Sequence, residues 1–350
     1  MAYSVSNVPT LMDLANISDP SGKVTAVVEM LNETNEILTD MAWREGNLPT
    51  GDRTTIRTGL PRPTWRKLYG FVQPSKATTA QVDEQCGMLE AFAEVDCALA
   101  DLNGNTAAFR LSEDRAHIEG MMQEMADTIF HGDGDGGASF VGLSPRYSSL
   151  TGEQNSDHVL NGATAFSSTA ATNSDVLNSV WLIVWGPNQI QGIVPKGSMA
   201  GLQTNDLGKK LIQGTHDTSS NAEASPGRMM SYVTHYRWDA GISVRDWRYA
   251  VRIANVSVND VTDLTSVAPG HLTLPELMHQ AIDTIPNMSS GRAAFYLSRK
   301  ALTAVRQSVS RLTSESVLSY ENVGGTMQTM FAGIPLRRVD ALAGDESIVT

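Results

Sequence analysis

The chain has 350 residues, of which 41% are hydrophobic and 18% are charged, and its formal net charge is -12 at pH 7. This length can bury one large core or two smaller ones, and no run approaches the roughly 18 apolar residues that would span a membrane. So negative a charge disfavours a sequence-reading nucleic-acid binder, because such proteins normally carry a basic face.

The start of the chain and its cysteines give no sign of export. Met1 to Ser4 lacks the basic region and apolar core of a secretion signal. Two cysteines, Cys86 and Cys97, are too few for a disulfide framework and suit a reducing cytoplasm. Neither belongs to a CxxC pair, so we expect both to be small buried apolar residues.

Charge is unevenly distributed in the first part of the chain. Residues 1–43 hold one lysine and six acids, residues 44–67 hold six basic residues and two acids, and residues 80–135 hold two arginines and thirteen acids. A cationic segment between anionic ones can pair with the acidic surface of a neighbouring copy. The alternative is an ordinary mixed surface, which the sharp segregation disfavours.

The first 45 residues predict an arm. Met1 to Pro20 has few packing residues, so it has to lie along its own domain or a neighbouring molecule. Residues 20–43 then show the apolar spacing of a helix. The side chains with this spacing are Val24, Val27, Val28, Leu31, Ile37, Leu38 and Met41.

Residues 46–79 predict a long hairpin-like loop rather than the interior of a sheet. Glycine and proline interrupt short β-prone pieces at close intervals, and aromatic residues are interleaved with basic ones. Such a loop can bind nucleic acid or reach a neighbouring subunit, and the acidity of the chain favours the second. The candidate inter-subunit contacts are Arg53, Arg57, Arg62, Trp65, Arg66 and Lys67.

A long helix is predicted for residues 106–131, preceded by a strand or short helix within residues 80–102. Apolar side chains recur along it in steps of three and four, and Gly132 follows where a left-handed residue often ends a helix. The stripe consists of Ala108, Leu111, Ile118, Met122, Met125 and Ile129. A helix with one narrow apolar stripe needs other elements laid along it.

Two glycine-rich stretches resemble ligand-binding loops, but neither has the neighbouring elements and residues that such a loop requires. Gly132 to Gly137 contains a formal GxGxxG, but it closes a predicted helix instead of opening one. Asp133 and Asp135 lack the downstream glutamate of a calcium loop. Gly201 to Lys209 has neither the spacing nor the Ser/Thr of a Walker A loop. The sequence therefore predicts no metal and no cofactor.

Loops are predicted for residues 138–178, which are rich in Ser, Thr, Asn and Gly, and strands follow them. Val180 to Trp185 and Ile190 to Val194 have β-rich composition. Met230 to Val258 alternates as a long β stretch, in which Gly241 is expected to bend or turn the chain.

The last third predicts alternating helix and strand. Thr273 to Glu276 is a capping box that opens a helix, Ala293 to Leu297 is a buried strand, and Ser298 caps a second helix. Met330 to Asp340 is predicted to be a strand with a bend.

Four segments stand out as longer sequence phrases: Trp185 to Gly197, Trp238 to Asn255, Ala294 to Arg299 and Gly333 to Asp340. They resemble segments of tailed-bacteriophage major capsid proteins of the Hong Kong 97 type, in particular those of epsilon-15-like short-tailed phages. The order of arm, basic loop, long helix, β ribbon and α/β unit agrees with that family over nearly the whole chain. The resemblance implies an α+β fold of the Hong Kong 97 capsid type.

The resemblance also implies a division into the parts of that fold. These parts are an N-terminal arm at 1–45, an E-loop at 46–80, a peripheral domain at 81–135 that includes the spine helix 106–131, a first axial-domain part at 136–228, a peripheral-domain β ribbon at 229–260, and a second axial-domain part with the C-terminal strand at 261–350.

By the same resemblance the chain is a major capsid protein and not an enzyme. It is expected to self-assemble as hexamers and pentamers into an icosahedral virion shell, with the family's common triangulation number of seven. The shell would enclose double-stranded DNA without sequence-specific binding and without a membrane. The other expected partners are a scaffolding protein, a portal protein and a decoration protein, with assembly in the host bacterial cytoplasm. An anionic wall suits this role, because one that bound phosphates tightly would impede DNA packaging.

Two other classes of protein stay open at this stage. An encapsulin-type cargo shell shares the fold, and DNA inside the particle would distinguish the two. A cytoplasmic enzyme would need a catalytic constellation, and no HExxH pair or GxSxG motif occurs among the seven histidines. His235 lies in an alternating strand and is predicted to be a packing residue.

Overall fold

The computed structural model describes residues 33, 35–102, 105–153, 155–162, 177–198, 200–216, 225–257, 273–311, 318–323, 326–343 and 346–350. They form two compact units, described separately below. The described part of unit 1 consists of Glu33 and of residues within 88–125 and 201–238. Unit 2 draws on 34–87, 126–200 and 239–350. Within the described ranges, no helix is long and apolar enough to cross a membrane.

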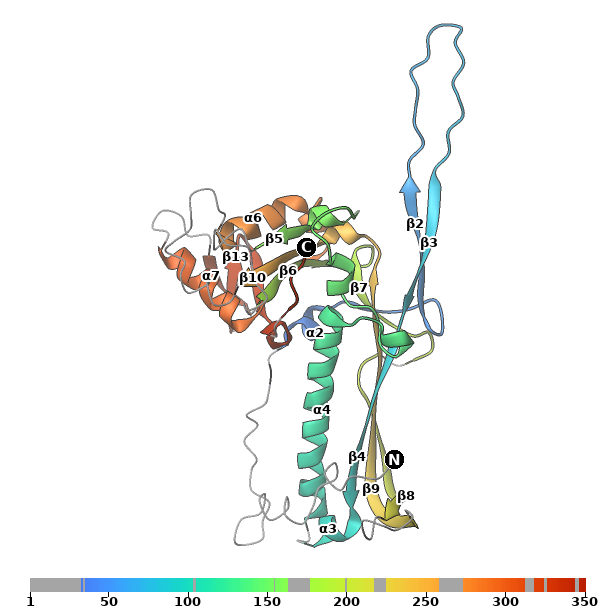
Figure 1. Cartoon of the computed structure of the whole chain (residues 1–350), viewed down its shortest axis with the longest axis vertical. Coiled ribbons are helices and arrows are strands. Elements are labelled where there is room, and N and C mark those ends of the chain that lie inside the picture. The colour runs from blue at the N-terminus through green and yellow to red at the C-terminus, as the bar shows by residue number, and fades with distance from the viewer. Residues whose placement is uncertain are drawn as a thin grey trace. The chain divides into compact units, whose positions relative to one another are not determined.

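Unit 1 contains a β ribbon, a short helix and most of a long helix (Figure 1). Its elements are β4 (Gly87–Asp96), α3 (Cys97–Asp101), α4 (Thr106–His131), β8 (Gln203–His216) and β9 (Ser225–Val244). β8 and β9 pair antiparallel along the whole of β8, and β4 is the next strand beside β9. The segment before the long helix is therefore both a strand and a short helix.

Helix α4 has the bounds that its sequence predicts, but its buried face differs from the predicted stripe. Leu111 and Met122 are 52% and 40% exposed. The buried apolar positions are Phe109, Met121, Met125, Ala126, Ile129 and Phe130. A prediction that counts steps of three and four from Ala108 misses the two phenylalanines, whose large surfaces help decide which face is buried.

Unit 2 is built on a sheet centred on β6 (Leu177–Trp185), all of whose residues are buried. β6 pairs antiparallel with β10 along one edge and with β11 along the other, and β11 pairs parallel with β14. The other strands are β1 (Trp43–Glu45), β5 (Val159–Asn161), β7 (Ile190–Val194), β10 (Ala250–Ser257), β11 (Arg292–Leu297), β12 (Leu318–Val323), β13 (Thr326–Phe331) and β14 (Ile334–Arg338). This confirms the predicted strands at 180–185, 190–194 and 293–297.

Two helices complete the core of unit 2. α6 (Leu274–Thr284) packs against β10, and α7 (Arg299–Arg311) packs against β14. The predicted capping residues act as expected. The backbone N–H of Thr273 donates to Glu276 at 2.6 Å, and the Ser298 hydroxyl accepts from the backbone N–H of Ala301 at 3.4 Å.

The predicted arm and loops are described only in part. Within 1–45, α2 (Ile37–Asp40) and β1 are described, and residues 1–32 and 34 lie outside the described residues. Of the helix predicted over 20–43, the described residues are helical only at Ile37–Asp40; its predicted end is wrong, because the chain is extended at Met41 and enters β1 at Trp43. The predicted loops of 138–178 also contain β5 and the 3-10 turns η3 (Ser144–Tyr147) and η4 (Ser156–His158), and β6 begins at Leu177. Residues 163–176 are outside the described part.

Two glycines have a different role from the predicted one. β9 runs unbroken through Gly241, where a Cβ would lie 2.8 Å from the carbonyl oxygen of Gln85. Gly132 does not adopt left-handed φ, and a Cβ there would lie 2.6 Å from the carbonyl oxygens of Thr128 and Phe140. Both positions require glycine because another backbone passes close by, and neither uses its freedom to turn.

The chain at 330–340 is a tight hairpin, where the sequence suggested a bent strand. β13 and β14 pair antiparallel through Phe331 opposite Ile334. Ala332 and Gly333 between them have φ angles of 49° and 80°. A two-residue turn with both φ values positive matches the twist of the strands on either side.

Candidate assembly interface

The basic segment predicted as a loop forms its own two-stranded sheet. β2 (Gly51–Gly59) and β3 (Thr78–Gln85) pair antiparallel from Gly51 opposite Gln85 to Gly59 opposite Thr78. Residues 60–77 join them without regular strand, and they extend beyond the paired part of the ribbon (Figure 1). We call this connecting segment the hairpin tip.

Large apolar side chains of the hairpin tip are open to solvent. Trp65 and Phe71 are fully exposed, at 104% and 100%. The others are Leu60, Leu68, Tyr69 and Val72, each more than half exposed. A protein that works alone rarely exposes so many large apolar side chains together, and such clusters are typical of surfaces that bind a partner.

The predicted cationic contacts fall into two groups. Arg57, Arg62, Arg66 and Lys67 are exposed on or beside the tip, and residues 57–77 contain no acid. Arg53 instead pairs across the ribbon with Asp83, with two hydrogen bonds of 2.6 Å. Those bonds raise the pKa of Arg53 and lower the pKa of Asp83. Arg53 therefore has a partner in its own chain.

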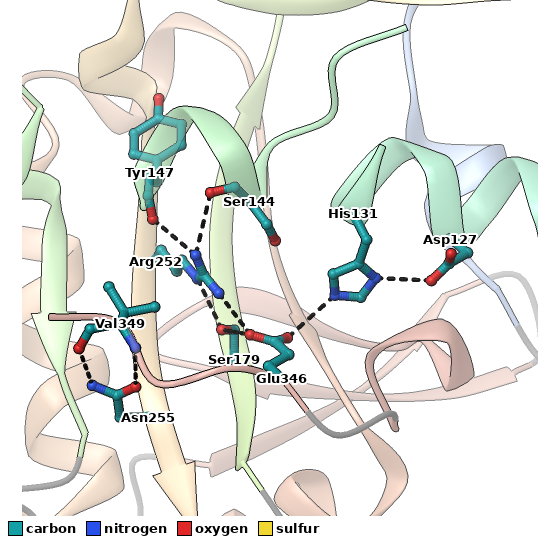
Figure 2. Close-up of polar contacts among 9 residues, drawn as sticks. All are labelled: Asp127, His131, Ser144, Tyr147, Ser179, Arg252, Asn255, Glu346 and Val349. Atoms are coloured by element: carbon teal, nitrogen blue, oxygen red, sulfur yellow. Dashed lines mark hydrogen bonds and ion pairs between the residues drawn. The ribbon is translucent and has the colours of Figure 1, made fainter. Parts of the chain in front are cut away.

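A second polar cluster, which the sequence did not predict, is centred on the buried Arg252 of β10 (Figure 2). Arg252 donates to Glu346 at 2.7 Å and to the Ser179 hydroxyl at 2.9 Å. It also donates to the carbonyl oxygens of Tyr147 and Ser144, at 2.8 and 3.3 Å. One guanidinium thus joins η3, β6, β10 and residues 346–350.

His131, the last residue of α4, extends this cluster. Its Nδ1 lies 2.8 Å from Asp127 and its Nε2 lies 3.4 Å from Glu346. Burial lowers the pKa of His131, but hydrogen bonds with both carboxylates outweigh that effect and raise the pKa to about 9. Burial raises the pKa of Glu346, and the bonds with His131 and Arg252 leave it below its usual value. The pair is charged at neutral pH.

Asn255 holds the adjoining backbone of residues 346–350. Its amide nitrogen donates to the carbonyl oxygen of Val349 at 2.8 Å, and its amide oxygen accepts from the backbone N–H of Val349 at 2.9 Å (Figure 2). This two-bond pairing imitates a strand partner. The cluster is a structural tie, and no spacing rule in the sequence would reveal it, because Glu346 is 94 residues from Arg252.

The other chemistry-bearing side chains named in the sequence have structural surroundings. Cys86 and Cys97 are free and half-buried, and burial raises the pKa of Cys86 to about 12. His235 stacks on Phe92 with ring centroids 4.5 Å apart, which confirms its packing role. In the described part of the chain, no three His, Cys, Asp or Glu side chains are placed to hold a metal ion.

The chain is similar to known phage capsid proteins. It matches the family model for major capsid protein GP7 over residues 19–350. Its fold matches the near-atomic structure of bacteriophage epsilon15 with a TM-score of 0.75 and 29% identity, over 100% of this chain and 99% of that chain. No curated protein is similar enough to count as a match.

Two further solved structures are more distant. The capsid of bacteriophage JBD30 has a TM-score of 0.44 at 9% identity, over 93% of this chain and 99% of that one. An encapsulin from Synechococcus elongatus has a TM-score of 0.39 at 10% identity, over 71% and 96%. Scores this low carry no weight beside the epsilon15 match. The α+β Hong Kong 97-type fold expected from the sequence is confirmed, and this chain belongs to the GP7 family of major capsid proteins, which form the shell of a bacteriophage virion.

Proposed function

We propose that in the shell the β2–β3 hairpin of one copy lies on a neighbouring copy, held by the hairpin tip. The observation that carries this is the exposure of Trp65 and Phe71, which are fully open to solvent among the described residues. Contacts between different patches of identical chains close into rings of five or six, as the hexamers and pentamers of an icosahedral shell require. A neighbour that covers the tip would remove several large apolar side chains from water at once.

The distribution of charge supports an acidic surface of a neighbouring copy as the surface that binds the hairpin tip. The tip has basic residues and no acids, whereas residues 80–135 hold thirteen acids against two arginines. Opposite potentials steer the encounter and fix its register more than they add affinity. The contact residues we propose are therefore Arg57, Arg62, Trp65, Arg66 and Lys67, with Arg53 acting inside the hairpin.

The named parts of the capsid fold are assigned as proposals. The N-terminal arm is 1–45 and the E-loop is 46–80, with the peripheral domain at 81–135 and 229–260 and the axial domain at 136–228 and 261–350. Support for the peripheral domain comes from unit 1, which unites α4 with the β8–β9 ribbon, although its limits are narrower. The large sheet of unit 2, with α6 packed on β10 and α7 packed on β14, supports the axial domain.

The partners follow from the same role. The shell encloses double-stranded DNA without reading its sequence, and it assembles in the bacterial cytoplasm with a scaffolding protein and around a portal protein. A decoration protein would be a further partner of the shell, and seven is the triangulation number common in the family. The chain itself uses no cofactor and catalyses no reaction. The acidity of the chain supports weak contact with DNA, because phosphates are repelled rather than bound.

The test is electron cryomicroscopy of particles assembled from the full chain co-expressed with the phage's scaffolding protein. We expect a closed shell in which the side chains of Trp65 and Phe71 contact a neighbouring copy. A tip that stays in solvent at every position in the shell would refute the inter-subunit role. Particles that package protein cargo in place of DNA, in infected cells, would favour the encapsulin alternative.

A further inference from the structure

The root of the hairpin holds two facing buried carboxylates. Asp52 of β2 and Glu84 of β3 are opposite each other in the strand register, so their side chains lie on the same side of the ribbon. They are 0% and 7% exposed. Two like charges in this arrangement repel and lose hydration, so the root forms only if other groups neutralise both.

Two arginines from different parts of unit 2 neutralise Asp52. Arg44 of β1 donates to one carboxylate oxygen at 3.3 Å, and Arg245, just after β9, donates to the other at 3.0 Å. Arg245 is itself fixed to the β6–β7 turn. Its guanidinium donates to the carbonyl oxygen of Pro187 at 3.1 Å. Its backbone N–H donates to the carbonyl oxygen of Gln189 at 2.9 Å.

A third arginine neutralises Glu84. Arg146 of η3 makes two parallel hydrogen bonds of 2.6 Å to the two oxygens of Glu84. A paired fork of this kind fixes direction as well as distance. Arg146 also donates to the carbonyl oxygen of Gly142 at 3.1 Å, so its position is set by its own loop.

The backbone of the root is equally constrained. A Cβ on Gly51 would lie 1.9 Å from the carbonyl oxygen of Glu84, so the two strands approach as closely as glycine permits. The backbone N–H of Cys86 donates to the carbonyl oxygen of Thr50 at 2.9 Å. The backbone N–H of Gly46 donates to the carbonyl oxygen of Val194 in β7 at 2.8 Å. The next rung outward, Arg53 and Asp83, is half exposed.

We propose that Asp52 and Glu84, with Arg44, Arg146 and Arg245, form a clamp that fixes the direction in which the hairpin leaves unit 2. They act as positioning residues, because they bind one another within a single copy and so determine where the tip arrives. The clamp draws on β1, η3 and the corner after β9, so its three arginines constrain the ribbon from three separate segments. This inference rests on the proposed role of the tip in joining copies.

The test compares two variants of the full, unassembled chain by amide hydrogen exchange. Asp52→Asn with Glu84→Gln keeps the side-chain shapes and removes both charges, while Arg53→Gln breaks the exposed pair one rung away. We expect exchange in residues 51–56 and 80–85 to accelerate about tenfold or more in the double variant, with exchange in β6 and β11 unchanged. Arg53→Gln should change the root less than about twofold.

Assembly with the scaffolding protein is measured on the same variants. We expect the double variant to give fewer closed shells and a wider spread of particle diameters. The clamp is refuted if exchange at the root rises less than about twofold, or if it rises equally in β6 and β11. If the double variant does not fold, Glu84→Gln alone is judged by the same criteria.

The two proposals can fail separately. If the root loosens but shells form normally, and tip variants also assemble normally, the inter-subunit role of the tip is wrong while the clamp stands as a local structure. If tip variants block assembly and the root of the double variant stays protected, the clamp is wrong and the tip proposal is untouched.

Discussion

Arg252 and Glu346 form an ion pair at 2.7 Å in which both side chains are nearly buried, 5% and 9% exposed. The pair joins β10, which pairs with the central strand β6, to residues 346–350. A buried ion pair adds little stability compared with apolar residues of the same shape, but removal of one partner leaves an uncompensated buried charge. Removal of one partner of this ion pair should therefore lower the stability of the fold by more than the intact pair contributes to it.

Glu346→Gln should destabilise the unassembled chain by about 3 kcal/mol, because Arg252 keeps its charge and loses its counter-ion. The midpoint of urea unfolding, followed by circular dichroism, measures this loss. Asp83→Asn is the matched control, since it breaks an exposed carboxylate–arginine pair and should leave the midpoint unchanged. Equal midpoints for wild type and Glu346→Gln would show that the tie is dispensable.

Alkaline pH should weaken the same cluster through His131. The folded-state pKa of about 9 lies above the usual value of 6.5, so the charged imidazole stabilises the fold fully below pH 6.5. That contribution, at most about 3 kcal/mol, is lost as pH rises from 6.5 through 9. Urea unfolding at pH 6.5, 8 and 9.5 measures the decline. His131→Gln should flatten this part of the profile, and a variant with the wild-type slope would contradict the assignment.

Charge reversal at the tip should impair assembly without harming the fold. Arg57→Glu with Arg62→Glu places acids where the proposed receptor is acidic, so we expect at least about a tenfold drop in shell yield at low salt and partial recovery at high salt. Light scattering and negative-stain microscopy give the yield. Replacement of both arginines by Gln should have a smaller effect. Yields equal to wild type at both salt concentrations would exclude these contacts.

Removal of the apolar tip side chains should reduce shell assembly without changing the stability of the unassembled chain. Trp65→Ser with Phe71→Ser takes away two fully exposed rings, so the unfolding midpoint of the unassembled chain should not change. Shell yield should fall strongly, because in the shell the same rings are proposed to be buried. Normal shells from the double variant would contradict the proposal.

Close backbone packing at Gly241 should make alanine costly there. A Cβ would lie 2.8 Å from the carbonyl oxygen of Gln85, so Gly241→Ala should destabilise by about 1–3 kcal/mol. Gly120→Ala is the control, because a Cβ in this part of α4 meets nothing within 4 Å and alanine favours helix. The midpoint of thermal unfolding is measured for both variants. Equal changes in the midpoint would mean that the backbone around Gly241 shifts to accommodate the added methyl group.

Local patterns in the sequence predicted several elements closely. The bounds of α4, the capping box at Thr273, the buried strand at 293–297 and the hairpin nature of 46–79 all follow from interactions within a few residues, which short-range spacing records. The family resemblance, carried by segments such as Trp238 to Asn255, predicted the capsid fold. The buried face of α4 was missed because two phenylalanines outweigh the regular stripe.

By itself the sequence determined that this is an acidic chain with a basic, aromatic loop punctuated by glycine and proline, and its resemblance to phage capsid proteins predicted the α+β fold. Only the tertiary structure decided which charges meet: Asp52 with Arg245, Glu84 with Arg146, and Arg252 with Glu346. The physical reason is that a buried charge is stabilised by whichever opposite charge the fold brings within hydrogen-bonding distance. These partners are 62 to 193 residues apart in the chain, beyond the reach of any local pattern.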